Sequence, residues 1–154
     1  MEEARNLFEA RRAIESVTTS LAAKVILTSQ LADLRRQIER QDRANKTGQF
    51  TQALLELGRF HQQLARLSNN GVLVEVIEPL LIRTSLVVAV FGHHQALATM
   101  PDQLSNIVDH LQNGTSTPAA RAMEQCLYKL QSQLDWKTRP QEPLPIEQSL
   151  SRVR

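Results

Sequence analysis

Apolar side chains recur at helical spacing in the segment FTQALLELGRFHQQLARLSNN. The repeated positions are Phe50, Leu54, Leu57 and Leu64, and a Ser-Asn-Asn-Gly stop follows them. Side chains three, four or seven residues apart lie on one side of an α-helix, so the segment predicts an amphipathic helix with one buried face. His61 lies on that same face. A histidine there is either a packed core residue or the floor of a pocket.

The helical period recurs along most of the chain. Further helices are predicted over residues 3–26, after the cap candidates Thr28-Ser29, after Asn70-Gly71, from Met100, and from a Thr117-Pro118 cap. The chain has only 5 glycines, 6 prolines and 4% aromatic residues. Leu, Ala, Gln and Arg are frequent, and these residues lose little side-chain freedom in helices. We therefore expect an all-α domain over residues 1–136. A proline-containing tail, 137–154, follows it, with a short element near 146–153.

The apolar run at residues 72–91 is long enough to span a bilayer. Its charged residues Glu75, Glu78 and Arg83 argue against that, because each charge near the membrane centre costs about 2.5–3.5 kcal/mol. The run instead predicts a deeply buried central helix, with a shared face of Leu73, Val76, Leu80 and Val87. Arg83 lies on that face too. No membrane partner is expected.

Charge and cysteine content favour a cytoplasmic protein that does not bind DNA by itself. Residues 1–136 contain 14 Lys/Arg and 14 Asp/Glu, so the excess of +2 lies in the tail. A nucleic-acid reader usually shows a basic face or stripe. The N-terminus has no apolar signal-peptide core. With Cys126 as the one cysteine, no internal disulfide forms, which suits a reducing compartment.

Two arginines interrupt predicted apolar faces. Arg11 lies on the stripe of the first helix, whereas Arg12 and Glu15 are expected to turn away from it. Arg11 either snorkels or pairs with a buried acid, or it is held in a pocket to receive an anion. Arg83 forms an ion pair with Glu75, Glu78 or a neighbouring helix, or it faces the same cavity as Arg11 and His61.

The sequence shows none of the common catalytic motifs. It contains no Gly-rich phosphate loop, HExxH, GxSxG or CxxC. The adjacent histidines His93 and His94 suggest a metal, but neighbouring residues on a helix do not face each other, so a surface loop is expected. We therefore predict no enzyme activity. An anion held by buried cations in a bundle core is the more consistent function.

Four short motifs together resemble a known family: EARRAIE at residues 9–15, FHQQLARLSNNGVL at 60–73, LLIR at 80–83 and NGTSTPAARAMEQCL at 113–127. Over about residues 4–134 the chain is similar to the effector-binding FCD domain of FadR-type GntR transcriptional regulators. The resemblance implies an all-α antiparallel bundle of six to seven helices, a small-acid or acyl effector in its centre, and a homodimer. It implies that Arg11 meets the effector carboxylate and that His61 ligates a divalent metal.

The sequence departs from the family's metal-binding pattern. The resemblance places an acid where this chain has Leu57, and histidines near Leu104 and at Cys126. Only His61 and the soft Cys126 remain, against the three or four protein ligands of a zinc site. We therefore predict no tightly bound metal, no cofactor and a more apolar pocket.

A second departure concerns DNA. The family reads DNA with an N-terminal winged helix, and Met1 stands where the effector domain normally begins. DNA contact is therefore expected only through a separate or missing winged-helix domain.

Two hypotheses follow. In the first, the chain is a ligand-sensing, dimerising domain that binds a small organic anion among Arg11, His61, Arg83 and Asn70. In the second, it is a degenerate helical dimerisation or interaction module that binds no ligand. A packed centre with Arg11 paired to an internal acid favours the second.

Overall fold

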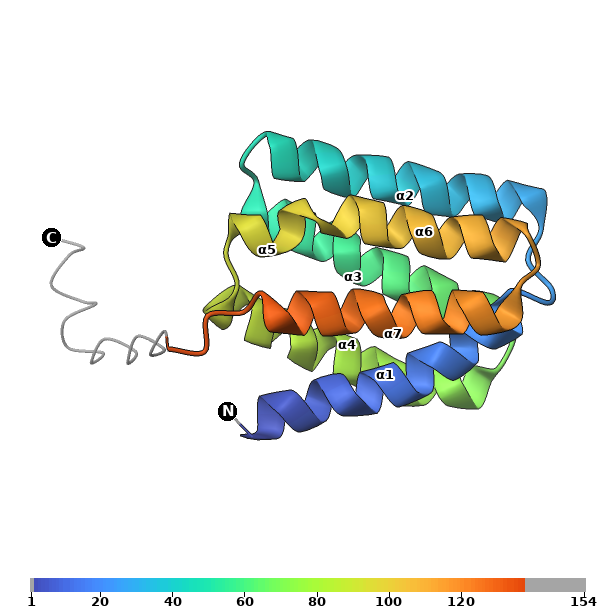
Figure 1. Ribbon diagram of the computed structural model, residues 1–154, viewed down its shortest axis with the longest axis horizontal. Helices are drawn as coiled ribbons and strands as arrows, with labels where there is room; N and C mark the ends of the chain where they lie inside the picture. Colours follow the sequence, from blue (N-terminus) through green and yellow to red (C-terminus); the bar gives the residue numbers. More distant parts are fainter. Residues whose placement is uncertain (1, 138–154) are drawn as a thin grey trace, which may run out of the picture.

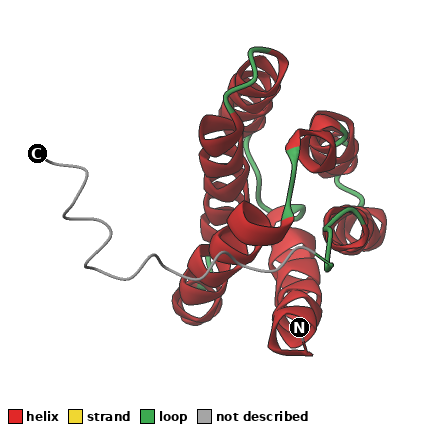
Figure 2. Ribbon diagram, turned by 90° about the vertical axis from the view of Figure 1, so that its left-hand side faces the viewer, coloured by secondary structure: helices red, strands yellow, loops and turns green. Residues whose placement is uncertain are grey.

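The computed structural model describes residues 2–137, and these form helices joined by short turns without any strand (Figures 1 and 2). The helices are α1 (Glu2–Ala22), α2 (Thr28–Lys46), α3 (Phe50–Leu67), α4 (Gly71–Phe91), α5 (His94–Ala98), α6 (Met100–Gln112) and α7 (Ser116–Ser132). The predicted all-α class and the count of six to seven helices are confirmed. Apart from Lys137, the predicted tail and its short element lie outside the described residues.

Six of the helices form a closed antiparallel ring. Going round it, α2 packs on α6, α6 on α7, α7 on α1, α1 on α4, α4 on α3, and α3 on α2 (Figure 1). The short α5 caps one end, in contact with α2, α3 and α6. Helices α1 and α3 also touch across the ring. Side chains from these two helices therefore meet in the centre, where the candidate site lies.

The predicted inward face of α3 is confirmed, and α6 and α7 bury a face of the same kind. Their buried residues include Leu54, Leu57, His61 and Leu64 of α3, Leu104, Ile107, Val108 and Leu111 of α6, and Met123, Cys126, Leu127 and Leu130 of α7. Each set recurs at three- and four-residue intervals, because that spacing returns to one side of a helix. The large side chains Phe8, Phe60 and Met100 fill the space between these faces, fully buried.

The prediction of a deeply buried central helix at residues 72–91 was wrong. Helix α4 packs chiefly on α3 and α1, and its buried residues are Ile77, Leu81, Thr84 and Val88. Of the predicted face, Val76 is 48% exposed, whereas Leu73, Leu80 and Val87 are half-buried. Apolar residues lie on every side of α4, so periodicity could not identify its inner side. No helix in the described part of the chain has the length and apolarity needed to cross a membrane.

Helix boundaries differ from prediction by a few residues. Helix α1 ends at Ala22 rather than 26 and leaves Val25 in an exposed turn. Leu27, not Thr28 or Ser29, is the N-cap of α2, and its backbone N–H donates to Gln30 Oε1. Thr115 rather than Thr117 is the N-cap of α7.

The pair of adjacent histidines was predicted to lie in a surface loop. Both are exposed, but only His93 precedes a helix, as the N-cap of α5, while His94 is its first residue.

Candidate functional site

The centre of the ring contains a buried ion pair on α1. Arg11 Nε–H donates to Glu15 Oε1 across 2.5 Å, and the two side chains are 4% and 1% exposed. Residues four apart on a helix lie on one face, which is why both point inward. Of the two predicted roles for Arg11, pairing with a buried acid is the one the structure displays.

His61 reaches the same carboxylate from α3. Its Nδ1 lies 2.5 Å from Glu15 Oε2, and its side chain is 2% exposed. A carboxylate accepts hydrogen bonds, so Nδ1 carries the hydrogen. The ring also packs edge-on against Phe60, with centroids 5.8 Å apart. Glu15 therefore joins α1 to α3 and fixes which way the imidazole points.

The charges around Glu15 keep it ionised. Burial alone would raise its pKa, but the charges of Arg11 and His61, and hydrogen bonds from both, outweigh burial and lower the pKa from 4.5 to about 2. The carboxylate is thus a permanent anion at neutral pH, held inside the bundle by a guanidinium and an imidazole.

Two polar atoms of this cluster have no hydrogen-bond partner. Arg11 Nη2 and His61 Nε2 are both fully buried and unbonded. The two residues line a small cavity of about 10 Å³, bounded by Leu57 and Gly58 of α3 and by Leu81, Thr84 and Val88 of α4. That volume suits about one water molecule. Leaving such groups unsatisfied costs about 1–3 kcal/mol each, so the cavity lining favours a small polar occupant.

The donor set does not fit a tightly bound metal. His61 offers Nε2, but Cys126 is a poor ligand because burial, reinforced by the Glu15 charge, raises the pKa of its thiol to about 12. Leu57 and Leu104 carry no lone pair to donate. No group of three or more His, Cys, Asp or Glu side chains within residues 2–137 is arranged to hold an ion. Metal analysis by mass spectrometry would test the predicted absence of metal.

Arg83 does not face this cavity, as one of its two predicted roles required. Its side chain is half exposed and forms an ion pair with Glu3 of α1, in line with the other role, a pair with a neighbouring helix. Arg83 and Glu3 instead line a surface hollow of about 280 Å³ between α1 and α4. Arg83 is turned outward because its neighbour Thr84 belongs to the buried side of α4.

Asn70 is the N-cap of α4. Its Oδ1 accepts a hydrogen bond from the backbone N–H of Leu73 at 3.2 Å. The structure shows no hydrogen bond between Asn70 and Arg11 or His61, and Asn70 is not among the residues that line the central cavity. Its predicted contact with a ligand stays a prediction.

Glu15 is the site residue that sequence reasoning missed. It was expected to turn away from the apolar stripe, yet it is the residue that both Arg11 and His61 contact. Its spacing of four from Arg11 was the available signal, because that spacing places two side chains on the same face.

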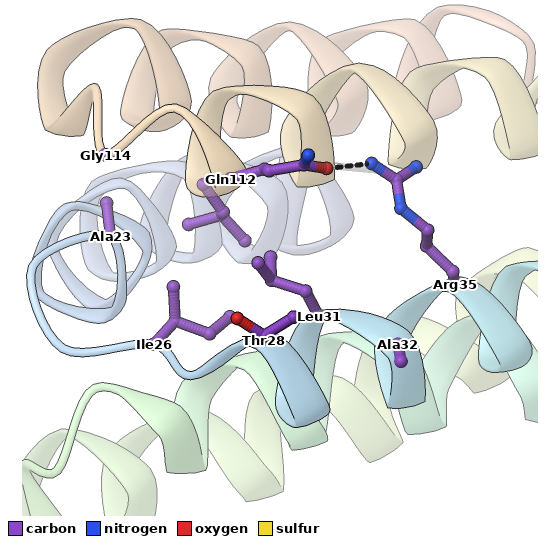
Figure 3. A pocket seen from close by; sticks show the side chains of 9 residues that line it. Ala23, Ile26, Thr28, Leu31, Ala32, Arg35, Gln112 and Gly114 are labelled. Carbon is purple, nitrogen blue, oxygen red and sulfur yellow. Dashed lines mark hydrogen bonds between the residues drawn. The ribbon is translucent and has the colours of Figure 1, made fainter.

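A wider hollow of about 420 Å³ lies at one end of the bundle, between the start of α2 and the end of α6 (Figure 3). Its lining combines apolar side chains, such as Ala23, Ile26 and Leu31, with polar groups from Thr28 and Gln112. The charged residue in the lining, Arg35, is already bonded to Gln112 Oε1 at 2.7 Å and to Asp109 Oδ1 at 3.0 Å. Unlike the centre, this hollow has no buried polar side-chain atom without a partner among its lining residues, so it is the weaker candidate for a ligand site.

Comparison with known proteins identifies the family. The family model "FCD domain" matches residues 6–129, so the chain belongs to the FCD domain family. Such domains are parts of GntR-family transcription regulators and generally serve effector binding and oligomerisation. A search of curated proteins found no match.

Solved structures show the same fold. E. coli McbR/YncC aligns with a TM-score of 0.78 at 16% identity, over 86% of this chain and 67% of that one. Streptococcus agalactiae GntR aligns with a TM-score of 0.73 at 20% identity, over 84% of this chain and 58% of that one. This chain therefore spans about three fifths to two thirds of their length, and these regulators share its helical architecture.

Proposed function

We propose that this chain is the ligand-sensing and dimerisation domain of a GntR/FadR-type regulator, with a small organic acid or acyl compound as effector. The observation that carries the proposal is the pair of unbonded, buried atoms Arg11 Nη2 and His61 Nε2 at one cavity. A guanidinium N–H is suited to a carboxylate, and the ring nitrogen of His61 offers a second polar contact at the same cavity. The proposal includes a cytoplasmic location and DNA contact through a separate winged-helix domain, and it assigns no catalysis.

An effector larger than water requires the cavity to widen. The wall supplied by α4, through Leu81, Thr84 and Val88, is the one most able to move, because α4 packs chiefly on two neighbours and has a solvent-facing outer side. The hydroxyl of Thr84 already donates to Leu80 O at 2.7 Å, so it would offer the ligand only an acceptor. Effector binding would thus act on the position of α4.

The second hypothesis, an interaction module without a ligand, is favoured by a specific observation. The centre is packed, and Arg11 is already paired with the internal acid Glu15. In that case Glu15 permanently occupies the place that an effector carboxylate would take. The two hypotheses differ in whether an added anion stabilises the protein.

A thermal-shift screen with short- and medium-chain carboxylic acids and acyl derivatives separates them. Binding at 100 times Kd should stabilise the native protein by about 2.7 kcal/mol. Arg11→Lys keeps the charge but removes the forked donor, so it should abolish the response. The matched control is Arg66→Lys, on the exposed Arg66–Glu78 pair of α3 and α4, which should respond as the unmodified protein does. No stabilisation by any compound would instead support the interaction module.

A further inference from the structure

The polar cluster at the centre of the ring is balanced in charge. The Glu15 carboxylate and the Arg11 guanidinium, which is always charged, cancel each other. The nearby thiol of Cys126 is uncharged, because burial raises its pKa to about 12. One carboxylate balances one cation, so the neutral imidazole of His61 is the form that leaves the cluster without net charge. His61 gains a second proton in acid, and in that range its charge helps to lower the pKa of Glu15.

The two unbonded atoms of this cluster need opposite partners in a hydrogen bond. Arg11 Nη2 carries hydrogens and can only donate, so it needs an acceptor. His61 donates its Nδ1 hydrogen to Glu15, so Nε2 of the neutral ring holds a lone pair and needs a donor. A carboxylate offers acceptors alone, whereas an amide or a hydroxyl group offers both an acceptor and a donor. The two atoms therefore match an uncharged head group better than an anion.

The rest of the cavity supplies no charge to balance an anion. Besides Arg11 and His61, the described residues that line it are aliphatic side chains, Gly58, Thr84 and Ser85. The hydroxyls of Thr84 and Ser85 already donate to backbone oxygens of α4. An ionised carboxylate in the cavity would share Arg11 with Glu15. It would leave one negative charge in excess inside the bundle, which is unfavourable in an apolar interior.

We infer that Glu15 makes the central site selective for an uncharged ligand, whose amide or hydroxyl head group accepts from Arg11 Nη2 and donates to His61 Nε2. This rests on the proposed function and narrows it: of the two kinds of effector named there, the uncharged acyl compound binds in preference to the ionised acid. Glu15 is not among the residues that line the cavity. It is a positioning residue, which acts by balancing the charge of Arg11 and by holding the hydrogen of His61 on Nδ1.

Removing the charge of Glu15 should reverse this preference. In Glu15→Gln the guanidinium of Arg11 loses its counter-charge, and the new side-chain amide can donate to His61 Nδ1. The ring then carries its hydrogen on Nε2, so both atoms at the cavity become donors. Two donors beside an unbalanced positive charge suit a carboxylate. The carboxylate of a ligand would thus replace the charge that the substitution removed.

Two ligands of one chain length test the selectivity. Thermal unfolding of the full chain is followed with sodium butyrate and with butyramide, which differ in the head group, against sodium chloride at equal concentration. For the unmodified protein the Kd of butyramide should be at least about tenfold below that of butyrate, because the amide satisfies both unbonded atoms. In Glu15→Gln the order should reverse, and if this variant is unfolded, butyrate rather than butyramide should restore its fold. Butyrate that binds the unmodified protein as tightly as butyramide overturns the inference.

Two further variants separate the selectivity from the presence of a ligand site. Leu57→Ala shortens a side chain that lines the cavity, so it gives a ligand room without changing a polar atom. Stabilisation by butyrate alone would refute the uncharged ligand and leave a carboxylate sensor standing. No stabilisation by either compound, in the unmodified protein and in Leu57→Ala, would refute both proposals. The matched charge control Asp33→Asn, at an exposed ion pair, should keep the preference for butyramide.

The position of the hydrogen on His61 gives a test that needs no ligand. Nitrogen NMR distinguishes a ring nitrogen that carries a hydrogen from one that holds a lone pair. At neutral pH, Nδ1 of His61 should give the signal of the first kind and Nε2 that of the second. His61→Gln assigns both signals by their loss, and in Glu15→Gln the two should exchange. A hydrogen on Nε2 of the unmodified protein at neutral pH would overturn the inference.

Discussion

Arg11 and Glu15 lie one turn apart on α1 and form an ion pair inside the helical ring, with Nε and Oε1 separated by 2.5 Å. His61 completes the arrangement from α3. Two helices are therefore joined by one carboxylate. The centre of an otherwise apolar bundle therefore contains a polar cluster, in which Arg11 and His61 both contact the Glu15 carboxylate.

Removing the charge of Glu15 should destabilise the fold strongly. Glu15→Gln leaves the Arg11 guanidinium buried without its counter-charge, which typically costs about 3–5 kcal/mol. The control Asp33→Asn, at an exposed pair with Arg36, should change the free energy of unfolding by no more than about 0.5 kcal/mol. Urea unfolding at neutral pH measures both, and equal small effects would contradict the ion-pair account.

Stability should fall in acid through the same residue. The folded-state pKa of Glu15 is about 2 against 4.5 for an unperturbed carboxyl, so the unfolded chain binds the proton first as pH decreases. The stabilisation is present above about pH 4.5 and is lost as pH falls towards 2, amounting to about 3 kcal/mol. Urea unfolding between pH 2 and 7 should show it, and the difference between the unmodified protein and Glu15→Gln should shrink over that window.

Cys126 should be chemically inert in the folded protein. Its thiol is buried and has its pKa raised to about 12, so almost no thiolate is present at neutral or mildly alkaline pH. A thiol reagent such as dithionitrobenzoate should react with one equivalent of cysteine in denaturant and with almost none under native conditions. Rapid native labelling would show that α7 opens or that the thiol is activated.

Gly58→Ala should stabilise the protein. The added Cβ would lie 3.7 Å from Ser85 Oγ, an ordinary contact, and alanine is favoured over glycine in a helix by about 0.5–1 kcal/mol. Gly48 is the matched control, because its φ of +73° penalises a side chain and Gly48→Ala should destabilise by about 1 kcal/mol. Urea unfolding compares them. Since Gly58 lines the central cavity, Gly58→Ala should also weaken any effector response.

Much of the fold could be predicted from the sequence. The stripe through Leu54, Leu57, His61 and Leu64 is buried as expected, because its apolar and polar residues alternate with a clear helical period. The all-α class follows from the same period repeated along the chain. The helical period did not predict the buried side of α4. Apolar residues lie on every side of this helix, so no face dominates and the position of Arg83 could not be decided.

The candidate site was predicted in part. Placing Arg11 and His61 in the interior was right, because each lies on a strongly patterned stripe. The direction of Glu15 was misjudged, since a carboxylate is expected outside unless its partners are known. Those partners are Arg11 on the same helix and His61, 46 residues later, and only the packing of α1 against α3 brings the second into contact.

The sequence by itself determined the helices, the family and the burial of Arg11 and His61, because these depend on local spacing and residue type. Only the tertiary structure decided what Arg11 and His61 contact, how small the cavity beside them is, and which side of α4 remains exposed. Such features arise from distances between segments far apart in the chain. A helical pattern specifies a buried face, but the neighbours that cover it are determined when the ring closes.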